Sequence, residues 1–328
     1  MSGQGIIVIV GPTAGGKSEL AVGVALGVGG EIINADSMQV YRQLNAGTAK
    51  PTAEQRAAVR HHLIDCVEPK ESWTVADWLA AAERLIGEMG QRGVRPIVVG
   101  GTNLYLKALL EGMFDGPGAN AALRARLAEL EAGELHERLA AVDAAAAARI
   151  DRHDHKRLVR ALEVWEATGR PISEQQRQWE GAGGGHDEGE RKYRHDPVLI
   201  GLRWSVEGIN RRINARVKGM FERLGAGAGG EDLVAETRRL EAAGLLGAGA
   251  REALGTKQVL AHLRGECGVA EAMERVKIDT RRFAKSQRTW LKRYRQVHWI
   301  EAEQSDPAER LKRALEVAGR AEPGKSEI

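Results

Sequence analysis

A short apolar segment, Ile6–Val10, runs directly into a glycine-rich loop, Gly11–Ser18, whose sequence is GPTAGGKS. The loop matches the pattern G-x-x-x-x-G-K-[ST], and the residues after it predict a helix. In such a strand–loop–helix unit, backbone N–H groups point at a bound phosphate and the helix N-terminus adds positive charge. The order of these elements therefore predicts an α/β fold with a phosphate site, rather than a chance glycine-rich turn.

The predicted phosphate site uses every residue of the loop. Its members are Gly11, Pro12, Thr13, Ala14, Gly15, Gly16, Lys17 and Ser18. The glycines let the backbone curl around an anion. Lys17 supplies a full positive charge, and the Ser18 hydroxyl is a candidate Mg²⁺ ligand. We therefore expect Mg²⁺ as the cofactor of this site.

Short apolar runs alternate with helical patterns over residues 1–115, as they do in βαβ units. The expected strands are Ile6–Val10, Glu31–Asn34 and Pro96–Val99, and Val198–Trp204 is expected to return to the same sheet. Parallel sheets bind ligands at the carboxyl ends of their strands. Asp36 and Thr102, which follow two of these strands, are therefore expected beside the phosphate loop.

Helical periodicity from Asn120 to Thr168 predicts an all-helical insertion over residues 119–197, with a glycine-rich loop at Gly181–Gly189. The core is then expected to consist of residues 1–118 and 198–318, with a flexible tail over 319–328. Further helices are expected at Val206–Arg223, Asp232–Ala243 and Met273–Tyr294, and a flexible loop at Gly225–Gly230.

The chain has 328 residues, a formal net charge of +3 and two cysteines, Cys66 and Cys267. This length is enough for one large or two modest domains. Two distant cysteines favour a reducing compartment over a disulfide scaffold. No targeting segment or membrane-spanning apolar run is evident, so we expect a cytoplasmic protein with no membrane partner. A monomer is the expected state.

Asp36 begins the segment Asp36–Gln39, directly after the second expected strand. Aspartate at this place is typical of a helix N-cap. Beside a bound phosphate, however, a carboxylate is repelled, so its presence indicates a function. It could hold Mg²⁺ through water or accept a proton. A nucleotide hydrolase usually carries an acid after its third strand, where this chain has Gly100-Gly101-Thr102. The loop is therefore expected to bind a phosphate without hydrolysing it.

Three weaker features accompany this site. Lys50, in the loop Gly47–Thr52, is placed to meet an anion, although surface lysines are common. His61 and His62 are adjacent and so rarely share a metal; we expect packing or a substrate hydrogen bond, and no zinc. Arg212 and Arg216 lie at i and i+4 on one helix face, where they can bind a diphosphate or form surface ion pairs.

The segment Arg275–Arg295 carries nine cations against one acid, Asp279. Such a charge run is often a solvated helix face, but the like charges repel one another on an isolated helix. A polyanionic partner relieves that repulsion, so the segment predicts nucleic-acid binding. A second basic cluster, His153–Arg160, lies within the helical insertion.

Together these motifs make the chain resemble the tRNA dimethylallyltransferases, also called tRNA isopentenyltransferases. The matching segments are residues 11–18, Asp36–Tyr41, Gly47–Pro51, His61–Asp65, Gly100–Tyr105, Arg160–Val164 and Thr280–Trp290. They fall in the family's order and span nearly the whole chain.

The resemblance implies a P-loop NTPase-like parallel-sheet core with an inserted helical domain that binds the anticodon stem-loop of tRNA. It implies transfer of a dimethylallyl group from dimethylallyl diphosphate to the N6 amine of adenosine 37, which is 3′ to the anticodon. The implied substrates are tRNAs that read codons beginning with U, and the products are N6-(dimethylallyl)adenosine and diphosphate.

Carried over by motif, Asp36, Thr102 and Arg216 are the expected catalytic residues. Asp36 would accept the amine proton, while Thr13, Lys17, Arg216 and Mg²⁺-bound Ser18 would neutralise the departing diphosphate. Ser37, Gln39 and Thr102 would hold the adenine. The residues expected to bind tRNA are Asp36, Ser37, Met38, Gln39, Asn103, Arg124, Lys156, Arg157, Arg160, Arg282 and Lys285.

Two positions depart from the family pattern. Thr256 stands where the family usually has an aromatic residue after Gly255, and the Gly225–Gly230 segment is longer than the usual turn. Neither lies on the expected proton path. Two other functions remain open from the sequence: a P-loop kinase acting on a small molecule with ATP, and a non-catalytic RNA-binding protein.

Overall fold

The computed structural model describes residues 5–113, 116–181, 193–222 and 231–319. The chain divides into two compact units, one formed by Met1–Leu110 with His195–Ile328 and the other by Glu111–Arg194. Sequence analysis placed these boundaries at 118 and 198. The expected loop Gly225–Gly230, and all but the first residue of the expected loop Gly181–Gly189 and of the expected tail, lie outside the described residues.

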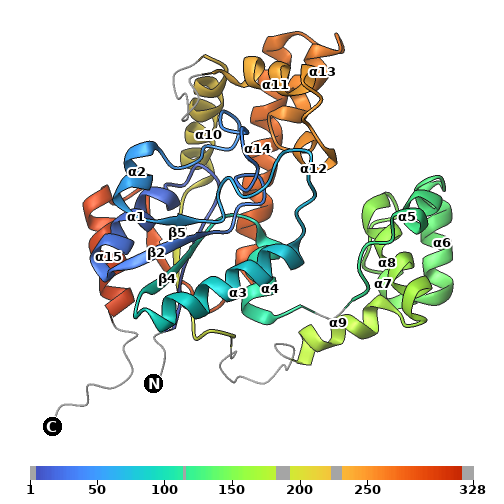
Figure 1. Cartoon of the computed structure of the whole chain (residues 1–328), viewed down its shortest axis with the longest axis horizontal. Helices are drawn as coiled ribbons and strands as arrows, with labels where there is room; N and C mark the ends of the chain where they lie inside the picture. The colour runs from blue at the N-terminus through green and yellow to red at the C-terminus, as the bar shows by residue number, and fades with distance from the viewer. Residues whose placement is uncertain (1–4, 114–115, 182–192, 223–230, 320–328) are drawn as a thin grey trace. The chain divides into compact units, whose positions relative to one another are not determined.

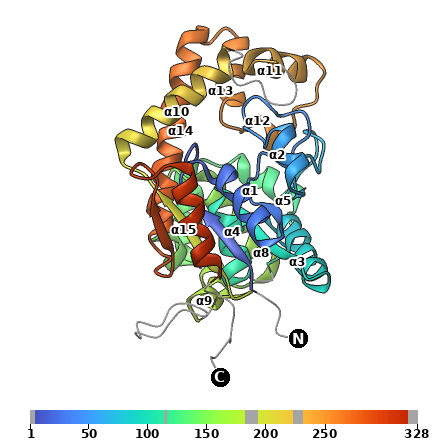
Figure 2. The ribbon, with the colours of Figure 1, turned by 90° about the vertical axis from the view of Figure 1, so that its left-hand side faces the viewer.

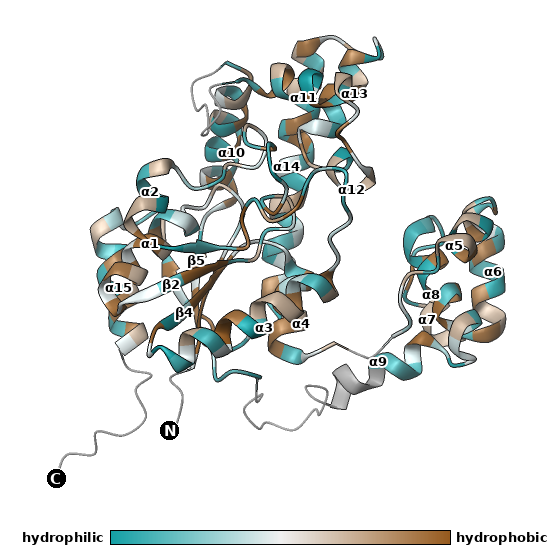
Figure 3. Cartoon of the chain, in the orientation of Figure 1, coloured by the Kyte–Doolittle hydropathy of each residue, from teal (hydrophilic) through white to brown (hydrophobic). Residues whose placement is uncertain are grey.

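The first unit is built on a six-stranded parallel sheet with the order β3-β2-β4-β1-β5-β6 (Figure 1). Its strands are β1 (Ile7–Val10), β2 (Gly30–Asn34), β3 (His61–His62), β4 (Arg95–Val99), β5 (Val198–Arg203) and β6 (His298–Glu301). In the central strand β1 every residue is buried, as expected of a parallel strand covered on both faces. Figure 3 shows this centre as a band of hydrophobic strands.

Four of the six strands match the sequence prediction to within a residue. The two edge strands were not predicted. β3 consists of two residues, which is too short for an alternating pattern. β6 begins with His298 and ends with Glu301, so it has no apolar run by which a strand could be predicted. Edge strands have one open side, so they need little apolar sequence.

Helices cover both faces of the sheet (Figures 1 and 2). On one face, α1 (Lys17–Val28) packs against α15 (Pro307–Gly319), where Gly23 and Gly27 make room for the side chains of Leu311 and Leu315. The other face carries α3 (Val75–Gln91) and α4 (Asn103–Glu111). Trp78 of α3 is fully buried there and stacks on Tyr105 of α4, with 4.5 Å between ring centroids.

The remaining helices of this unit extend beyond the carboxyl ends of the strands (Figure 1). They are α2 (Ala53–Ala58), α10 (Val206–Phe221), α11 (Leu233–Ala242), α12 (Ala248–Arg251), α13 (Thr256–Leu263) and α14 (Val269–Leu291). Helices α10 and α14 share an apolar core that includes Ile213, Val276 and Ala284. This packing brings two helices that are distant in sequence to the same edge of the sheet.

The second unit is helical, as predicted, with α5 (Ala121–Ala128), α6 (Ala132–Val142), α7 (Ala144–Ala147), α8 (His155–Thr168) and α9 (Ile172–Gly181). Its own core includes Leu127, Leu135, Leu139 and Leu158. In neither unit does a described helix combine the length and the apolar character needed to cross a membrane.

Candidate active site

The phosphate loop has the backbone geometry that its glycines predict. Gly11 has φ 144° and Gly16 has φ 89°, and a Cβ on Gly11 would lie 2.9 Å from the Leu202 carbonyl oxygen. Ala14 also has a positive φ, of 61°, which is unfavourable for a residue with a Cβ. The loop ends where α1 begins at Lys17, so the helix N-terminus faces the same space.

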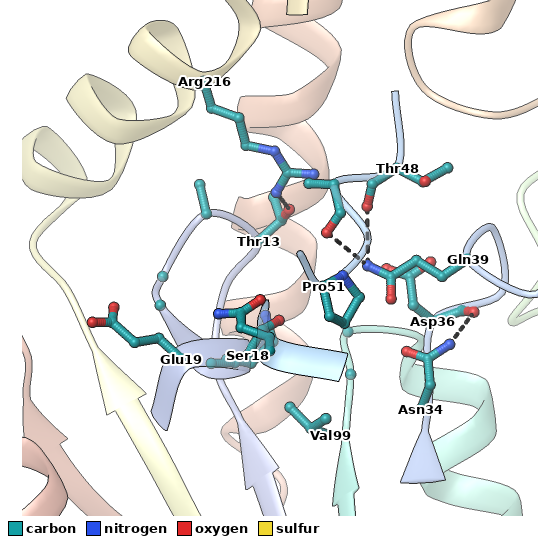
Figure 4. A pocket seen from close by; sticks show the side chains of 18 of the residues that line it. Thr13, Ser18, Glu19, Asn34, Asp36, Gln39, Thr48, Pro51, Val99 and Arg216 are labelled. Carbon is teal, nitrogen blue, oxygen red and sulfur yellow. Dashed lines mark hydrogen bonds between the residues drawn. The ribbon is translucent and has the colours of Figure 1, made fainter. Parts of the chain in front are cut away.

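A cavity of about 490 Å³ opens above this loop. Its walls include Thr13–Glu19 from the loop and α1, Asp36 and Gln39 after β2, Gly100 and Gly101 after β4, and Arg212 and Arg216 of α10. The segment around Thr48, His61 of β3 and two residues of α14 also contribute to the lining. In Figure 4 the side chains of Ser18 and Asp36 lie on either side, and Arg216 extends toward Thr13. The predicted meeting of strand ends is therefore confirmed. Gly11 and Pro12 lie outside this lining, which begins at Thr13.

Lys17 and Arg216 place two cations in this cavity. Lys17 Nζ donates to the Pro12 carbonyl at 2.8 Å, and removal from water lowers the Lys17 pKa to about 8, an effect that Asp36 opposes and Arg216 strengthens. Burial also lowers the pKa of Arg216. Arg216 donates one hydrogen bond to Thr13 Oγ1, while its Nε is buried and has no hydrogen-bond partner among the described residues. Both cations are thus desolvated, and within the described parts of the chain neither forms a salt bridge with a carboxylate, as expected of a site that binds an anion.

Arg212, four residues before Arg216, also reaches the phosphate loop. Its Nε donates to the Ala14 carbonyl at 2.7 Å, and its guanidinium stacks over Trp204. Trp204 in turn donates to the Gly15 carbonyl. The two arginines are therefore aligned along one side of the loop, in the arrangement that would suit a diphosphate.

Asp36 lies where this cavity meets a second one of about 290 Å³. The lining of the second cavity includes Ser37, Met38 and Thr102. The residues that line both cavities are Thr13, Asp36, Thr48, Arg216 and Phe283. Asp36 Oδ1 accepts a hydrogen bond from Met38 N at 2.9 Å, so the carboxylate also closes a local turn. No helix begins here, so Asp36 is not a helix N-cap; its partly buried side chain closes a turn and lines both cavities.

Thr102 fixes the segment after β2. Its Oγ1 accepts a hydrogen bond from Ser37 N at 2.9 Å and donates to Ser37 Oγ at 3.2 Å. Gln39 uses its amide to hold the carbonyls of Thr48 and Ala49 while it lines the first cavity. Asn103 begins α4 and lines neither cavity.

The expectation that Lys50 meets an anion is wrong. Its ammonium group is buried and donates to Tyr41 O, Asn45 Oδ1 and Asp65 Oδ1 at 2.6–3.0 Å. These acceptors satisfy all three of its N–H groups. Lys50 therefore holds its loop together and contributes no charge to the cavity.

The two adjacent histidines have separate partners. His62 Nε2 lies 2.7 Å from Glu31 Oε2, and His61 Nδ1 lies 2.8 Å from the Val59 carbonyl. His61 lines the first cavity, and burial lowers its pKa. Among the residues that the structure describes, no group of three or more histidines, cysteines and carboxylates is arranged to hold a metal.

Helix α14 begins at Val269 rather than at Met273, so Glu271 as well as Glu274 precedes the basic segment on the same helix. Glu271 pairs with Arg275 and Glu274 with Lys277, while Asp279 pairs with Arg282. Four other cations have no acidic partner within the described parts of the chain and line a cavity of about 740 Å³. They are Lys285, Arg288, Lys292 and Arg295. The unpaired positive charge is therefore concentrated in the second half of the segment.

All three arginines of the insertion that were predicted to bind RNA have internal partners. Arg124 and Arg160 both bind the carboxylate of Glu163, which is 0% exposed, and Arg157 pairs with Asp154. Burial alone would raise the pKa of Glu163, but the hydrogen bonds from Arg124 and Arg160 outweigh it and hold the pKa below its ordinary value. Lys156 is exposed and has no such partner in the described structure.

Sequence reasoning missed Gln287, which lies in α14 and lines the first cavity. Its position follows Ala284 and precedes Leu291 on the buried face of the helix. A polar residue in an otherwise apolar stripe is the signal that could have identified it.

Comparison with known proteins agrees with this geometry. The family model described as IPP transferase matches residues 39–294. The tRNA dimethylallyltransferase of Geobacter sulfurreducens is 44% identical over 90% of this chain and 91% of its own length, and that of Anaeromyxobacter sp. (strain K) is 47% identical over 90% and 92%.

Solved structures give the same result. The tRNA isopentenylpyrophosphate transferase of Bacillus halodurans has a TM-score of 0.70 and 33% identity, covering 97% of both chains. A eukaryotic dimethylallyltransferase acting on tRNA has a TM-score of 0.73 and 25% identity, covering 93% of this chain and 77% of the other. The chain therefore belongs to the IPP transferase family of enzymes.

Proposed function

We propose that this enzyme transfers the dimethylallyl group of dimethylallyl diphosphate to the N6 amine of adenosine 37 in tRNAs that read codons beginning with U. The observation that carries the proposal is the position of Asp36. It lies between a cavity walled by the phosphate loop and a second cavity walled by Ser37, Met38 and Thr102. The first suits the diphosphate, and the second suits the adenine.

In the proposed reaction the adenine N6 attacks C1 of the dimethylallyl group. A new C–N bond forms as the C–O bond to the diphosphate breaks, and the diphosphate leaves with the bonding electrons. An adenine amine is barely acidic, so its proton leaves only as the C–N bond forms. Asp36 is the carboxylate placed to accept that proton. Lys17 and Arg216 stabilise the negative charge that develops on the leaving group.

Mg²⁺ fits the same site. Ser18 lines the first cavity, and its hydroxyl has no hydrogen-bond partner among the described residues. Mg²⁺ typically takes one or two protein oxygens and completes its coordination with phosphate oxygens and water. We therefore propose that Ser18 holds Mg²⁺ against the diphosphate, where the ion would supply further positive charge.

The nucleic-acid partner is proposed to be the anticodon stem-loop. A loop base is already single-stranded, so turning it out of its stack into the second cavity is inexpensive. The unpaired cations Lys285, Arg288, Lys292 and Arg295 of the basic segment suit the RNA backbone. We propose a monomer as the active form.

The test is mass spectrometry of nucleosides from a tRNA transcript incubated with enzyme, Mg²⁺ and dimethylallyl diphosphate. We expect one adenosine to exchange a hydrogen for a dimethylallyl group, and the gain to disappear in a matched transcript with guanosine at position 37. A gain that persists in this control would contradict the assignment of the position. Acceptor-dependent release of ADP from ATP, with no gain on adenosine, would instead indicate a kinase.

A further inference from the structure

Helix α14 turns one glutamine toward the interior. Gln287 is 1% exposed, and its neighbours on the same face, Ala284 and Leu291, are buried apolar residues. An amide buried without partners is unfavourable, so both ends of this side chain need hydrogen bonds. The partners of these two hydrogen bonds therefore show which parts of the protein Gln287 connects.

The Gln287 amide joins two loops of the site. Its Oε1 accepts a hydrogen bond from Thr13 N in the phosphate loop at 2.8 Å, and its Nε2 donates to the Gly101 carbonyl after β4 at 2.8 Å. A Cβ on Gly101 would lie only 2.2 Å from Nε2, so the contact depends on glycine there. The backbone N–H of Thr13 is therefore bonded within the protein.

Each of the two residues bonded to Gln287 is linked in turn to one of the two proposed substrate sites. Thr13 Oγ1 accepts the hydrogen bond from Arg216, on the diphosphate side. Thr102, next to Gly101, holds Ser37, whose neighbour is Asp36. A continuous series of hydrogen bonds and peptide links therefore runs from Arg216 through Gln287 to the segment that carries Asp36.

We propose that Gln287 is a positioning residue that sets the separation between the diphosphate site and Asp36. This inference rests on the proposed roles of those two sites. The amide is planar and both of its hydrogen bonds have good length, so it holds the two loops at a set distance from each other. Displacing reacting groups by about 1 Å can lower a rate about 100-fold even when each binding site stays intact. Gln287 acts through its neighbours and need not touch either substrate.

The test is Gln287→Met, which keeps the side-chain length and removes both hydrogen bonds. We expect kcat for dimethylallyl transfer to fall about 10- to 100-fold, with KM for dimethylallyl diphosphate and Kd for tRNA changed less than about threefold. Gln287→Asn keeps the amide but reaches only one partner, so it should show the same pattern with a smaller loss. If Gln287→Met does not fold, the kcat of Gln287→Asn still tests the inference.

Gln258 provides a matched control. It is also a buried glutamine, bonded to Gly255 N and to Asp279 of α14, and it lines neither cavity. Gln258→Met should lower thermal stability by a similar amount while kcat stays near the wild-type value.

An unchanged kcat in Gln287→Met, or losses of kcat equal in both Met variants, would overturn the inference. A rise in tRNA Kd as large as the fall in kcat would also overturn it, because Gln287 would then only support α14. Asp36→Ala separates these results from a failure of the proposed function. Full activity in that variant refutes the role of Asp36, whereas an inactive Asp36→Ala beside a normal Gln287→Met refutes the inference alone.

Discussion

The phosphate site and the helical insertion both contain buried charges, but among the described residues these charges are paired only in the insertion. In the insertion, Glu163 is buried but receives hydrogen bonds from Arg124 and Arg160. In the phosphate site, Lys17 and Arg216 are removed from water and form no salt bridge with any described carboxylate, and the pKa of each falls. The first arrangement stabilises a fold, whereas the second keeps positive charge available for a ligand. Substitutions that remove charge should therefore have opposite consequences in the two regions.

The largest expected effect is that of Lys17→Met. Removing the ammonium should lower kcat/KM for dimethylallyl diphosphate about 1,000-fold, since a preorganised cation facing the leaving group is lost. Thermal stability should stay the same or rise, because a desolvated charge is also removed. Steady-state kinetics and thermal unfolding of the same preparation check both parts. A large drop in stability would place Lys17 with the structural charges.

Glu163→Gln should have the reverse effect. Breaking a buried ion pair leaves two arginines without their counter-charge, so the free energy of unfolding should fall by about 3 kcal/mol. Because the Glu163 pKa is held below its ordinary value, its stabilisation is present above the unfolded-state pKa and lost as pH falls through the folded-state pKa. The difference between variant and wild type in urea unfolding should therefore shrink in acid. A difference that does not change with pH would contradict this assignment.

The pH dependence of binding offers a finer comparison. The free enzyme has a Lys17 pKa of about 8, so the ammonium loses its proton as pH rises through this value. We expect kcat/KM for dimethylallyl diphosphate to fall above about pH 8, and bound diphosphate to raise the pKa again. The free energy of unfolding should instead rise as pH increases above about 8, because the unfolded state binds the Lys17 proton more tightly than the folded state does. A flat profile to pH 9.5 (about 1.5 units higher) would show that Lys17 does not titrate there.

The smallest expected effect separates paired from unpaired cations on α14. Lys285→Ala should weaken tRNA binding a few-fold and reduce the slope of log Kd against log salt by about 1, as loss of one phosphate contact does. Arg275→Ala, in which the lost cation is already paired with Glu271, should change neither quantity. Filter binding at several salt concentrations measures both variants. Equal changes in the two variants would show that the lack of an acidic partner does not distinguish the cations that bind RNA.

The sequence was sufficient to predict the centre of the fold and the main parts of the site. The strand, loop and helix around Gly11–Ser18 lie together in sequence, so their local pattern determines the phosphate site. Asp36 and Thr102 could be placed because parallel strands bring their carboxyl ends to one edge. The resemblance supplied the proposed roles of these residues.

What the sequence could not show were contacts between distant residues. Lys50 looked like an anion ligand until its three acceptors were known, and Arg124 and Arg160 looked free until Glu163 was placed between them. Gln287 meets Thr13 from the far end of the chain. Such pairings depend on tertiary packing, which local periodicity does not encode.

The central claim is that Asp36 accepts the proton from the tRNA amine, and Asp36→Ala tests it most directly. Single-turnover transfer of a labelled dimethylallyl group should fall by about 1,000-fold or more, within the range for loss of a general base. The tRNA Kd, measured on the same protein, should stay within about threefold of wild type, because the phosphate contacts that dominate RNA affinity remain. A loss of tRNA binding as large as the loss of rate would contradict the account and make Asp36 a structural residue.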